Sequence, residues 1–99
     1  MAVSKISKRT SPYFDRILLP NPVDLNDITT PGFYAYTYGT QGTVSHSPTN
    51  AVFTLIVMFK NDSLGVNQLI IDNNTEMYFR VQWSSGWQTW KKVTATNVS

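Results

Sequence analysis

Few side chains in this sequence could catalyse a reaction, and they form no recognised catalytic pattern. His46 is the only histidine, so a nucleophilic triad or a histidine-bound metal would have to be built around it, beside Ser45 and Ser47. A solvated loop histidine is the simpler interpretation, and the His-X-His pattern of a metal site shared by three subunits is absent. Asp72 and Glu76 flank one turn and could approach each other, but paired turn acids are commonly solvated. We therefore predict no enzymatic activity, no catalytic residue, no metal and no cofactor.

Several aromatic and polar residues near the end of the chain could bind a ligand. The candidate glycan- or surface-binding residues are Tyr78, Arg80, Gln82, Gln88 and Trp90. Sugar C–H faces stack on Trp or Tyr rings, while amide and guanidinium groups bond to sugar hydroxyls. The favoured alternative for any one of these aromatics is that it fills a cross-strand position in a sheet. Such a face could also bind an oligonucleotide, but residues 23–99 carry four basic against five acidic side chains, so we expect no nucleic-acid partner.

A predicted β-hairpin positions this set. Ser84-Ser85-Gly86 is a three-residue connection whose glycine takes the left-handed conformation, which places Trp83 opposite Trp87 and Arg80 opposite Trp90. The core-like face of the hairpin then carries Met77, Phe79, Val81, Trp83, Trp87 and Thr89. The other face is amphipathic, could be exposed, and carries Tyr78, Arg80, Gln82, Gln88, Trp90 and Lys92. On it Arg80 can lie over the Trp90 ring, a cation–π pair worth about 0.5 to 1 kcal/mol when exposed.

The preceding residues predict the sheet to which this hairpin belongs. Alternation at 33–38 places Tyr34, Tyr36 and Tyr38 on one face of a strand. Residues 51–60 are apolar at almost every position, so we predict a central strand covered on both faces, by this domain or by a partner. Residues 24–28 fit one helical turn that docks Leu25 and Ile28, and further strands are expected at 66–71, 76–83 and 87–93. The predicted fold class is mainly β: a small antiparallel β-sheet or sandwich knob with one short helical turn near its start.

An extended N-terminal arm precedes this domain. Residues 1–22 show no sustained periodicity, and three prolines deny them a regular helix or a central strand. Four basic residues against one acid give the arm the basic character of the chain, whose net charge is +2. Its apolar patch, Tyr13-Phe14 and Ile17-Leu18-Leu19, needs a partner, either the domain itself or a neighbouring subunit. We divide the chain into an arm at 1–22, a β domain at 23–93 and a tail at 94–99.

The composition suits one small domain that associates with itself. A chain of 99 residues with 41% hydrophobic residues can close one modest core. It has no cysteine, and small domains without disulfides or metals often gain stability by self-association. The longest apolar stretch, Val52 to Phe59, is too short to span a bilayer, so we expect no membrane insertion.

A longer motif resembles a known family. The run from Asp24 to Tyr34, Asp-Leu-Asn-Asp-Ile-Thr-Thr-Pro-Gly-Phe-Tyr, is similar to the opening of the pyocin-knob type of domain in phage and pyocin tail fibres. Similar segments follow in order across the region 23–93: Val52 to Phe59, Gln68, Tyr78-Phe79-Arg80 and Trp87-Gln88-Thr89-Trp90-Lys91. The chain is shorter than most fibre proteins, which suggests a fragment or a short virion protein, and its arm has no counterpart in this pattern.

The resemblance implies a non-enzymatic, β-rich knob in a trimeric fibre, involved in attachment of a phage or phage-tail-like bacteriocin to the host cell. It also implies a homo-oligomer, a trimer, located in a virion tail fibre or phage-tail-like particle. The arm is expected to contact other virion or tail proteins. The alternative is an autonomous carbohydrate-binding module that recognises a cell-surface glycan. A third class, a small enzyme such as a wall hydrolase, would depend on His46, Asp72 or Glu76.

Overall fold

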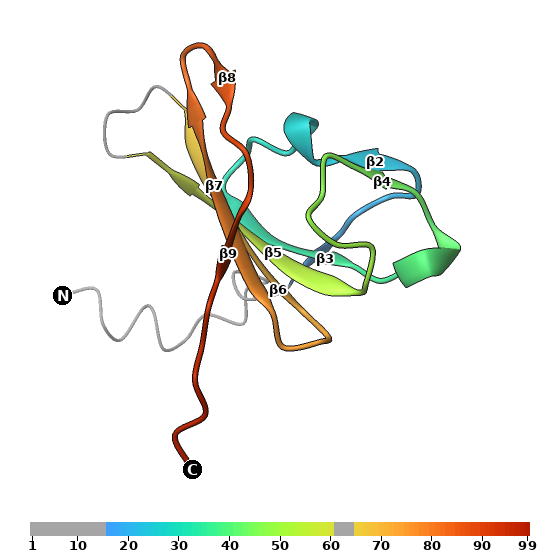
Figure 1. Cartoon of the computed structure of the whole chain (residues 1–99). Helices are drawn as coiled ribbons and strands as arrows, with labels where there is room; N and C mark the ends of the chain where they lie inside the picture. The colour runs from blue at the N-terminus through green and yellow to red at the C-terminus, as the bar shows by residue number, and fades with distance from the viewer. Residues whose placement is uncertain (1–15, 61–64) are drawn as a thin grey trace, which may run out of the picture.

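The computed structural model describes residues 16–60 and 65–99, which form a main sheet and a small second layer (Figure 1). The main sheet contains β1 (Ile17–Leu18), β3 (Gly32–Tyr36), β5 (Phe53–Phe59), β6 (Val66–Asp72), β7 (Met77–Trp83), β8 (Gly86–Trp87) and β9 (Lys91–Val93). Its order is β1-β3-β5-β6-β7-β8, with β9 also paired to β7, and the pairings from β3 through β9 are antiparallel. The predicted fold class, mainly β with an antiparallel sheet, is confirmed.

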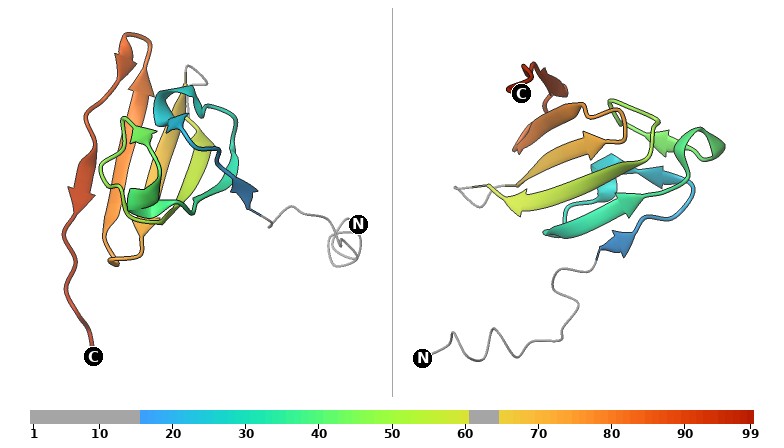
Figure 2. Two further views of the ribbon diagram at one scale, coloured as in Figure 1. Left: turned by 90° about the vertical axis from the view of Figure 1, so that its right-hand side faces the viewer. Right: turned by 90° about the horizontal axis from the view of Figure 1, so that it is seen from below.

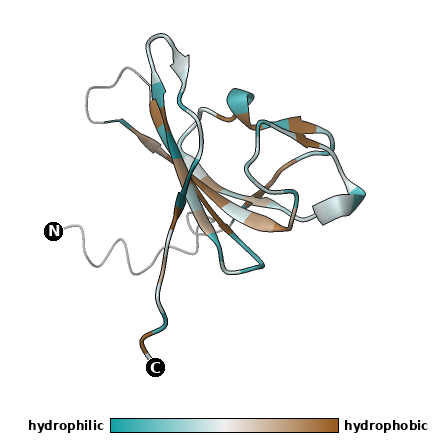
Figure 3. Cartoon of the chain, viewed as in Figure 1, coloured by the Kyte–Doolittle hydropathy of each residue, from teal (hydrophilic) through white to brown (hydrophobic). Residues whose placement is uncertain are grey.

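The second layer consists of a two-stranded parallel sheet, β2 (Val23–Asp24) and β4 (Val44–Ser45), with two 3-10 helices, η2 (Leu25–Asp27) and η3 (Gly39–Gln41). It lies against one face of the main sheet, as the two further views make clear (Figure 2). The buried core includes Tyr34, Tyr36, Phe53, Leu55, Val57, Val66 and Ile70 from the main sheet, Val23 and Leu25 from the second layer, and Leu19, which follows β1. Hydrophobic segments accordingly lie along the strands of both layers (Figure 3).

The predicted helical turn is present as η2. Asp24 caps it, because its Oδ1 accepts a hydrogen bond from the backbone N–H of Asn26 at 2.9 Å. Leu25 is fully buried and Ile28 packs against the core, so both apolar side chains dock as expected. No helix in the described part of the chain is long and apolar enough to cross a membrane.

The predicted central strand is confirmed as β5, which lies between β3 and β6. Its side chains alternate: Phe53, Leu55 and Val57 are buried, whereas Thr54 and Met58 are exposed. The described residues therefore cover β5 on one face only. The outer face of the main sheet, as we name the uncovered one, leaves several large hydrophobic side chains exposed on neighbouring strands: Phe33, Met58, Ile71, Phe79 and Trp83.

The predicted register of the last hairpin is wrong near the turn. Trp83 pairs with Gly86, so the loop has two residues, and Gln82 rather than Trp83 stands opposite Trp87. Farther out, Phe79 pairs with Lys91 and Tyr78 with Lys92, as predicted. Between these regions Gln88 bonds to Val81 and leaves both Thr89 and Trp90 opposite Arg80, which is a β-bulge. The extra residue of the bulge compensates for the shorter loop.

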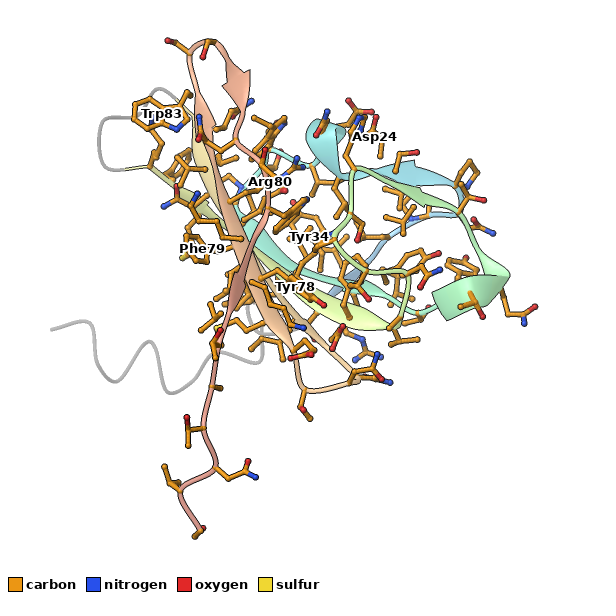
Figure 4. All side chains as sticks on the ribbon, viewed as in Figure 1. Asp24, Tyr34, Tyr78, Phe79, Arg80 and Trp83 are labelled. Atoms are coloured by element: carbon orange, nitrogen blue, oxygen red, sulfur yellow. The ribbon has the colours of Figure 1, made fainter. Side chains whose placement is uncertain are left out.

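The faces of β7 are also reversed relative to the prediction. Arg80 pairs with the buried Gln68 and is itself buried, while Phe79 and Trp83 lie on the outer face (Figure 4). The expectation that Trp83 and Trp87 share a buried face is therefore wrong: Trp83 is 53% exposed and its ring lies 5.0 Å from Lys60 Nζ.

The end of the predicted arm contacts the domain. Ile17 and Leu18 form β1, which pairs in parallel with β3, and the N–H of Leu19 donates to the carbonyl of Ala35 at 2.8 Å. Leu19 is buried in the core, so for this residue the domain itself is the partner. Ile17 and Leu18 are exposed, and Tyr13-Phe14 lies outside the described residues.

Candidate functional site

A buried hydrogen-bond network joins the main sheet to η2. Gln68, fully buried on β6, donates from Nε2 to the carbonyls of Leu25 at 2.8 Å and Ile28 at 2.9 Å. Its Oε1 accepts a hydrogen bond from Arg80 Nε at 2.9 Å. The Gln68 amide thus fixes η2 on one side and the Arg80 guanidinium on the other.

The Arg80 guanidinium is a buried cation held by aromatic rings. Its Cζ lies 4.0 Å from the ring centre of Trp87 and 4.6 Å from that of Trp90, both within cation–π range. Only 4% of the residue is exposed, and burial lowers the pKa of Arg80 to about 10, with the charge of Asp24 opposing the shift. At neutral pH Arg80 is therefore charged. Its Nη2 is buried without a hydrogen-bond partner in the described part of the chain.

Both tryptophans are fixed by their indole N–H groups. Trp87 Nε1 donates to the carbonyl of Asn26 at 3.3 Å, and Trp90 Nε1 donates to the carbonyl of His46 at 2.8 Å. These bonds attach the last hairpin to η2 and to the loop after β4. The two bonds therefore hold both rings against the second layer.

His46 is a structural link of the second layer. Its Nδ1 lies 2.8 Å from Asp24 Oδ1, and its backbone adopts φ 58°, a left-handed conformation uncommon for a residue other than glycine. The pKa of Asp24 is lowered, first by the hydrogen bond with His46 and second by the N–H of Asn26. The predicted solvated loop histidine is thus exposed, with 56% of its side chain accessible, but bonded.

A hollow opens where these elements meet. It has a volume of about 510 Å³, within the range of small-molecule sites, and its lining is mostly apolar. The lining residues come from η2, the loop after β4, β7 and the last hairpin: Asn26, His46, Ser47, Arg80, Gly86, Trp87, Gln88, Thr89 and Trp90. We call this the tryptophan hollow. A smaller hollow of about 280 Å³, on the side of Phe79 and Trp83, shares Arg80, Gln88 and Thr89 with it.

The structure brings together three of the five predicted binding residues. Arg80, Gln88 and Trp90 line the tryptophan hollow, and the predicted cation–π contact between Arg80 and Trp90 is present. Tyr78 instead packs against the core, and Gln82 does not line this hollow. The expected exposure of this face is wrong for Arg80, because Gln68 and two rings enclose it.

Sequence reasoning missed Trp87, Asn26 and Ser47 as lining residues, and Gln68 as the residue that fixes Arg80. Trp87 was misplaced because the assumed loop was one residue too long. Gln68 had a detectable signal, since it shares the strand face of Val66 and Ile70, where a polar side chain needs partners.

The acidic residues considered for catalysis have structural contacts. Asp72 Oδ1 accepts from the N–H groups of Asn74 at 2.9 Å and Glu76 at 3.0 Å, so it caps its turn. Glu76 forms an ion pair with Lys92 at 2.8 Å. Among the described residues, no group of three His, Cys, Asp or Glu side chains could hold a metal ion.

Fold and site together define a small two-layer β module with an aromatic hollow at one end of its main sheet. Comparison with known proteins adds no relative: no family model matches the chain, and no curated protein or solved structure does so.

Proposed function

We propose that this chain is an adhesive module of the tail-fibre type, which attaches a virion or phage-tail-like particle to the host cell by binding a surface glycan in the tryptophan hollow. The observation that carries the proposal is the pair Trp87 and Trp90, which line one apolar hollow beside Arg80. Two fixed indole rings suit the C–H face of a pyranose, because both surfaces are flat and apolar.

Polar groups around the hollow suit the rest of a sugar. Asn26, His46, Ser47 and Gln88 line it, and they supply amide, imidazole and hydroxyl groups for sugar hydroxyls. Asn26 Oδ1 is buried without a hydrogen-bond partner in the described residues. An apolar site with a few convergent polar groups is the usual composition of a small-molecule site.

The tail-fibre part of the proposal rests on the resemblance to pyocin-knob domains. Four of the five segments that carry this resemblance, all but Val52 to Phe59, are joined in the fold by side-chain contacts of Gln68 and Arg80, although they are far apart in the sequence. Gln68 joins η2 to Arg80, and Arg80 contacts Trp87 and Trp90. Motif segments that contact one another in the fold support a family resemblance more strongly than the same residues dispersed over a surface.

A glycan array probed with the whole chain tests the proposal. We expect retention of one glycan class, its loss in Trp90→Ala, and no loss in the matched control Trp83→Ala, because Trp83 lies outside the tryptophan hollow. Gln88→Trp, at an exposed rim position, should also abolish retention by filling the hollow while leaving the core intact. Retention of no glycan by the folded chain, or equal retention by wild type and Gln88→Trp, would refute the proposal.

A homotrimer is the second part of the proposed assembly, and the outer face of the main sheet supports it. Five large hydrophobic side chains are exposed there, at 39% to 53% of their surface, and contiguous exposed apolar surface usually marks an interface. We propose that further copies of the chain cover this face, and that the part of residues 1–22 that precedes β1 binds other virion proteins.

Sedimentation equilibrium tests the trimer. Wild type should sediment as three copies at micromolar concentration, and Ile71→Lys on the outer face should dissociate it, whereas Thr54→Lys at an already polar position of that face should be milder. A stable wild-type monomer at that concentration would contradict the assembly without affecting the glycan site.

A further inference from the structure

We infer that the ligand of the tryptophan hollow is an acidic sugar whose carboxylate binds the Arg80 guanidinium. This inference rests on the proposed glycan-binding function and specifies its substrate class. It starts from an incompletely satisfied cation: Arg80 donates one hydrogen bond within the described chain, from Nε to Gln68, and its Nη2 is buried without a partner.

No carboxylate of the described residues neutralises Arg80 directly. Asp24 is the acid whose charge acts on it, but Asp24 Oδ1 is already bonded to His46 and to the N–H of Asn26. Glu76 is paired with Lys92. A buried charge without a hydrogen-bonded counterion is unfavourable, and an anion that enters the hollow would remove that penalty.

The position of Arg80 matches the covalent geometry of an acidic sugar. Its Cζ lies 4.0 and 4.6 Å from the centres of the two indole rings. The guanidinium already lies against both rings, so a pyranose that enters the same hollow would contact the indole surface that Arg80 leaves uncovered. In uronic and sialic acids the carboxylate carbon is bonded directly to the sugar ring, so the carboxylate of such a sugar can point toward Arg80. A carboxylate also fits the planar guanidinium fork.

The charge of the site favours a carboxylate over a phosphate or sulfate polymer. Among the described residues, Arg80 is the only arginine or lysine that lines the hollow. One cation balances one carboxylate, whereas recognition of a more highly charged group ordinarily uses several basic side chains. The nearby charge of Asp24 would further disfavour a dianion.

Access to Nη2 requires a local movement, because this nitrogen is shielded from solvent in the free protein. The neighbouring groups are the two tryptophan rings, so we expect their environment to change on binding. Intrinsic tryptophan fluorescence then provides a direct readout of the site.

The experiment titrates the whole chain with matched acidic and neutral sugars. The pairs are oligogalacturonate with its carboxyl-reduced form, and sialyllactose with lactose, so the two arms distinguish uronic from sialic acids. We expect one acidic member to bind about tenfold or more tightly than its neutral counterpart, the gain from charge-assisted hydrogen bonds. Arg80→Met should abolish this preference, and Trp83→Ala should preserve it, provided that circular dichroism shows both to be folded.

The outcomes separate this inference from the function on which it rests. Equal binding of acidic and neutral members would overturn the acidic class and leave the glycan site standing. Binding of no sugar, here and on the array, would overturn both. Because the comparison varies the ligand on the wild-type chain, it decides the question even if Arg80→Met does not fold.

Discussion

Gln68→Leu is the substitution that most directly tests the buried network. Leucine has nearly the size and shape of glutamine but can neither donate nor accept a hydrogen bond. The change removes the bonds to two carbonyls and to Arg80 Nε. The Leu25 carbonyl keeps a partner, since the N–H of Ile28 donates to it at 3.2 Å, so the groups left without one are the Ile28 carbonyl and the charged Nε.

The expected loss of stability follows from these two groups. A buried neutral group without a partner costs about 1 to 3 kcal/mol, and a charged one costs more, while the added apolar surface of leucine offsets about 1 kcal/mol. We therefore expect the free energy of unfolding to fall by about 2 to 4 kcal/mol. Urea denaturation followed by circular dichroism and tryptophan fluorescence measures this difference.

Gln88→Leu is the matched control, because it makes the same chemical change at an exposed residue whose side chain forms no hydrogen bond in the described structure. It should alter stability by less than about 0.5 kcal/mol. The double variant Gln68→Leu, Arg80→Met should be less destabilised than the sum of the single variants by about 1 to 2 kcal/mol, since the buried charge is gone. If Gln68→Leu cost no more than Gln88→Leu, the argument from unsatisfied groups would be wrong.

Three further perturbations test separate contacts. Asp24→Asn keeps an N-cap but removes the charge. The folded-state pKa of Asp24 is lowered from 3.8, so the charged form stabilises the fold. In urea melts the wild type should therefore be more stable than the variant at pH 7, and this difference should be lost as the pH falls below 3.8. A stability difference between wild type and variant that stays the same from pH 7 to acid would contradict this expectation. Trp90→Phe removes the N–H donated to His46 and should cost about 1 kcal/mol by circular dichroism; an unchanged midpoint would show the bond to be dispensable. Gly42→Ala would place a Cβ 2.6 Å from Tyr38 Cβ and should lower stability by about 1 to 3 kcal/mol, a loss that an unaltered Tm would rule out.

The strand pattern of the sequence was sufficient to predict the fold class, the central strand and the helical turn. Each rests on local physics: alternation at 33–38, the apolar run at 51–60, and an aspartate that caps η2. The predicted register of the hairpin was wrong where two local features, the loop length and the bulge, compensate for each other. A two-residue loop and a later bulge give the same distal pairs as a three-residue loop, so Tyr78 and Lys92 were paired correctly while the tryptophans near the turn were not.

The inside and outside of β7 were harder to predict for an energetic reason. Phe79, Val81 and Trp83 are more apolar than Tyr78, Arg80 and Gln82, so hydrophobicity assigns the first set to the core. The fold does the reverse, because Gln68 bonds to Nε of Arg80 and two tryptophan rings contact its guanidinium, and these contacts offset part of the cost of burying the charge. The alternation of residues along a single strand does not reveal such contacts between distant segments.

The two indole hydrogen bonds link the tryptophan hollow to the folded state of the domain. They join residues 61 and 44 positions apart in the sequence, so both depend on contacts between distant segments of the chain. The tryptophan hollow is therefore a feature of the folded state, because its lining residues come from segments that are distant in the sequence. A ligand that recognises it would stabilise the native state alone and raise the melting temperature of the entire domain, so a thermal-shift screen can find ligands before the sugar is identified.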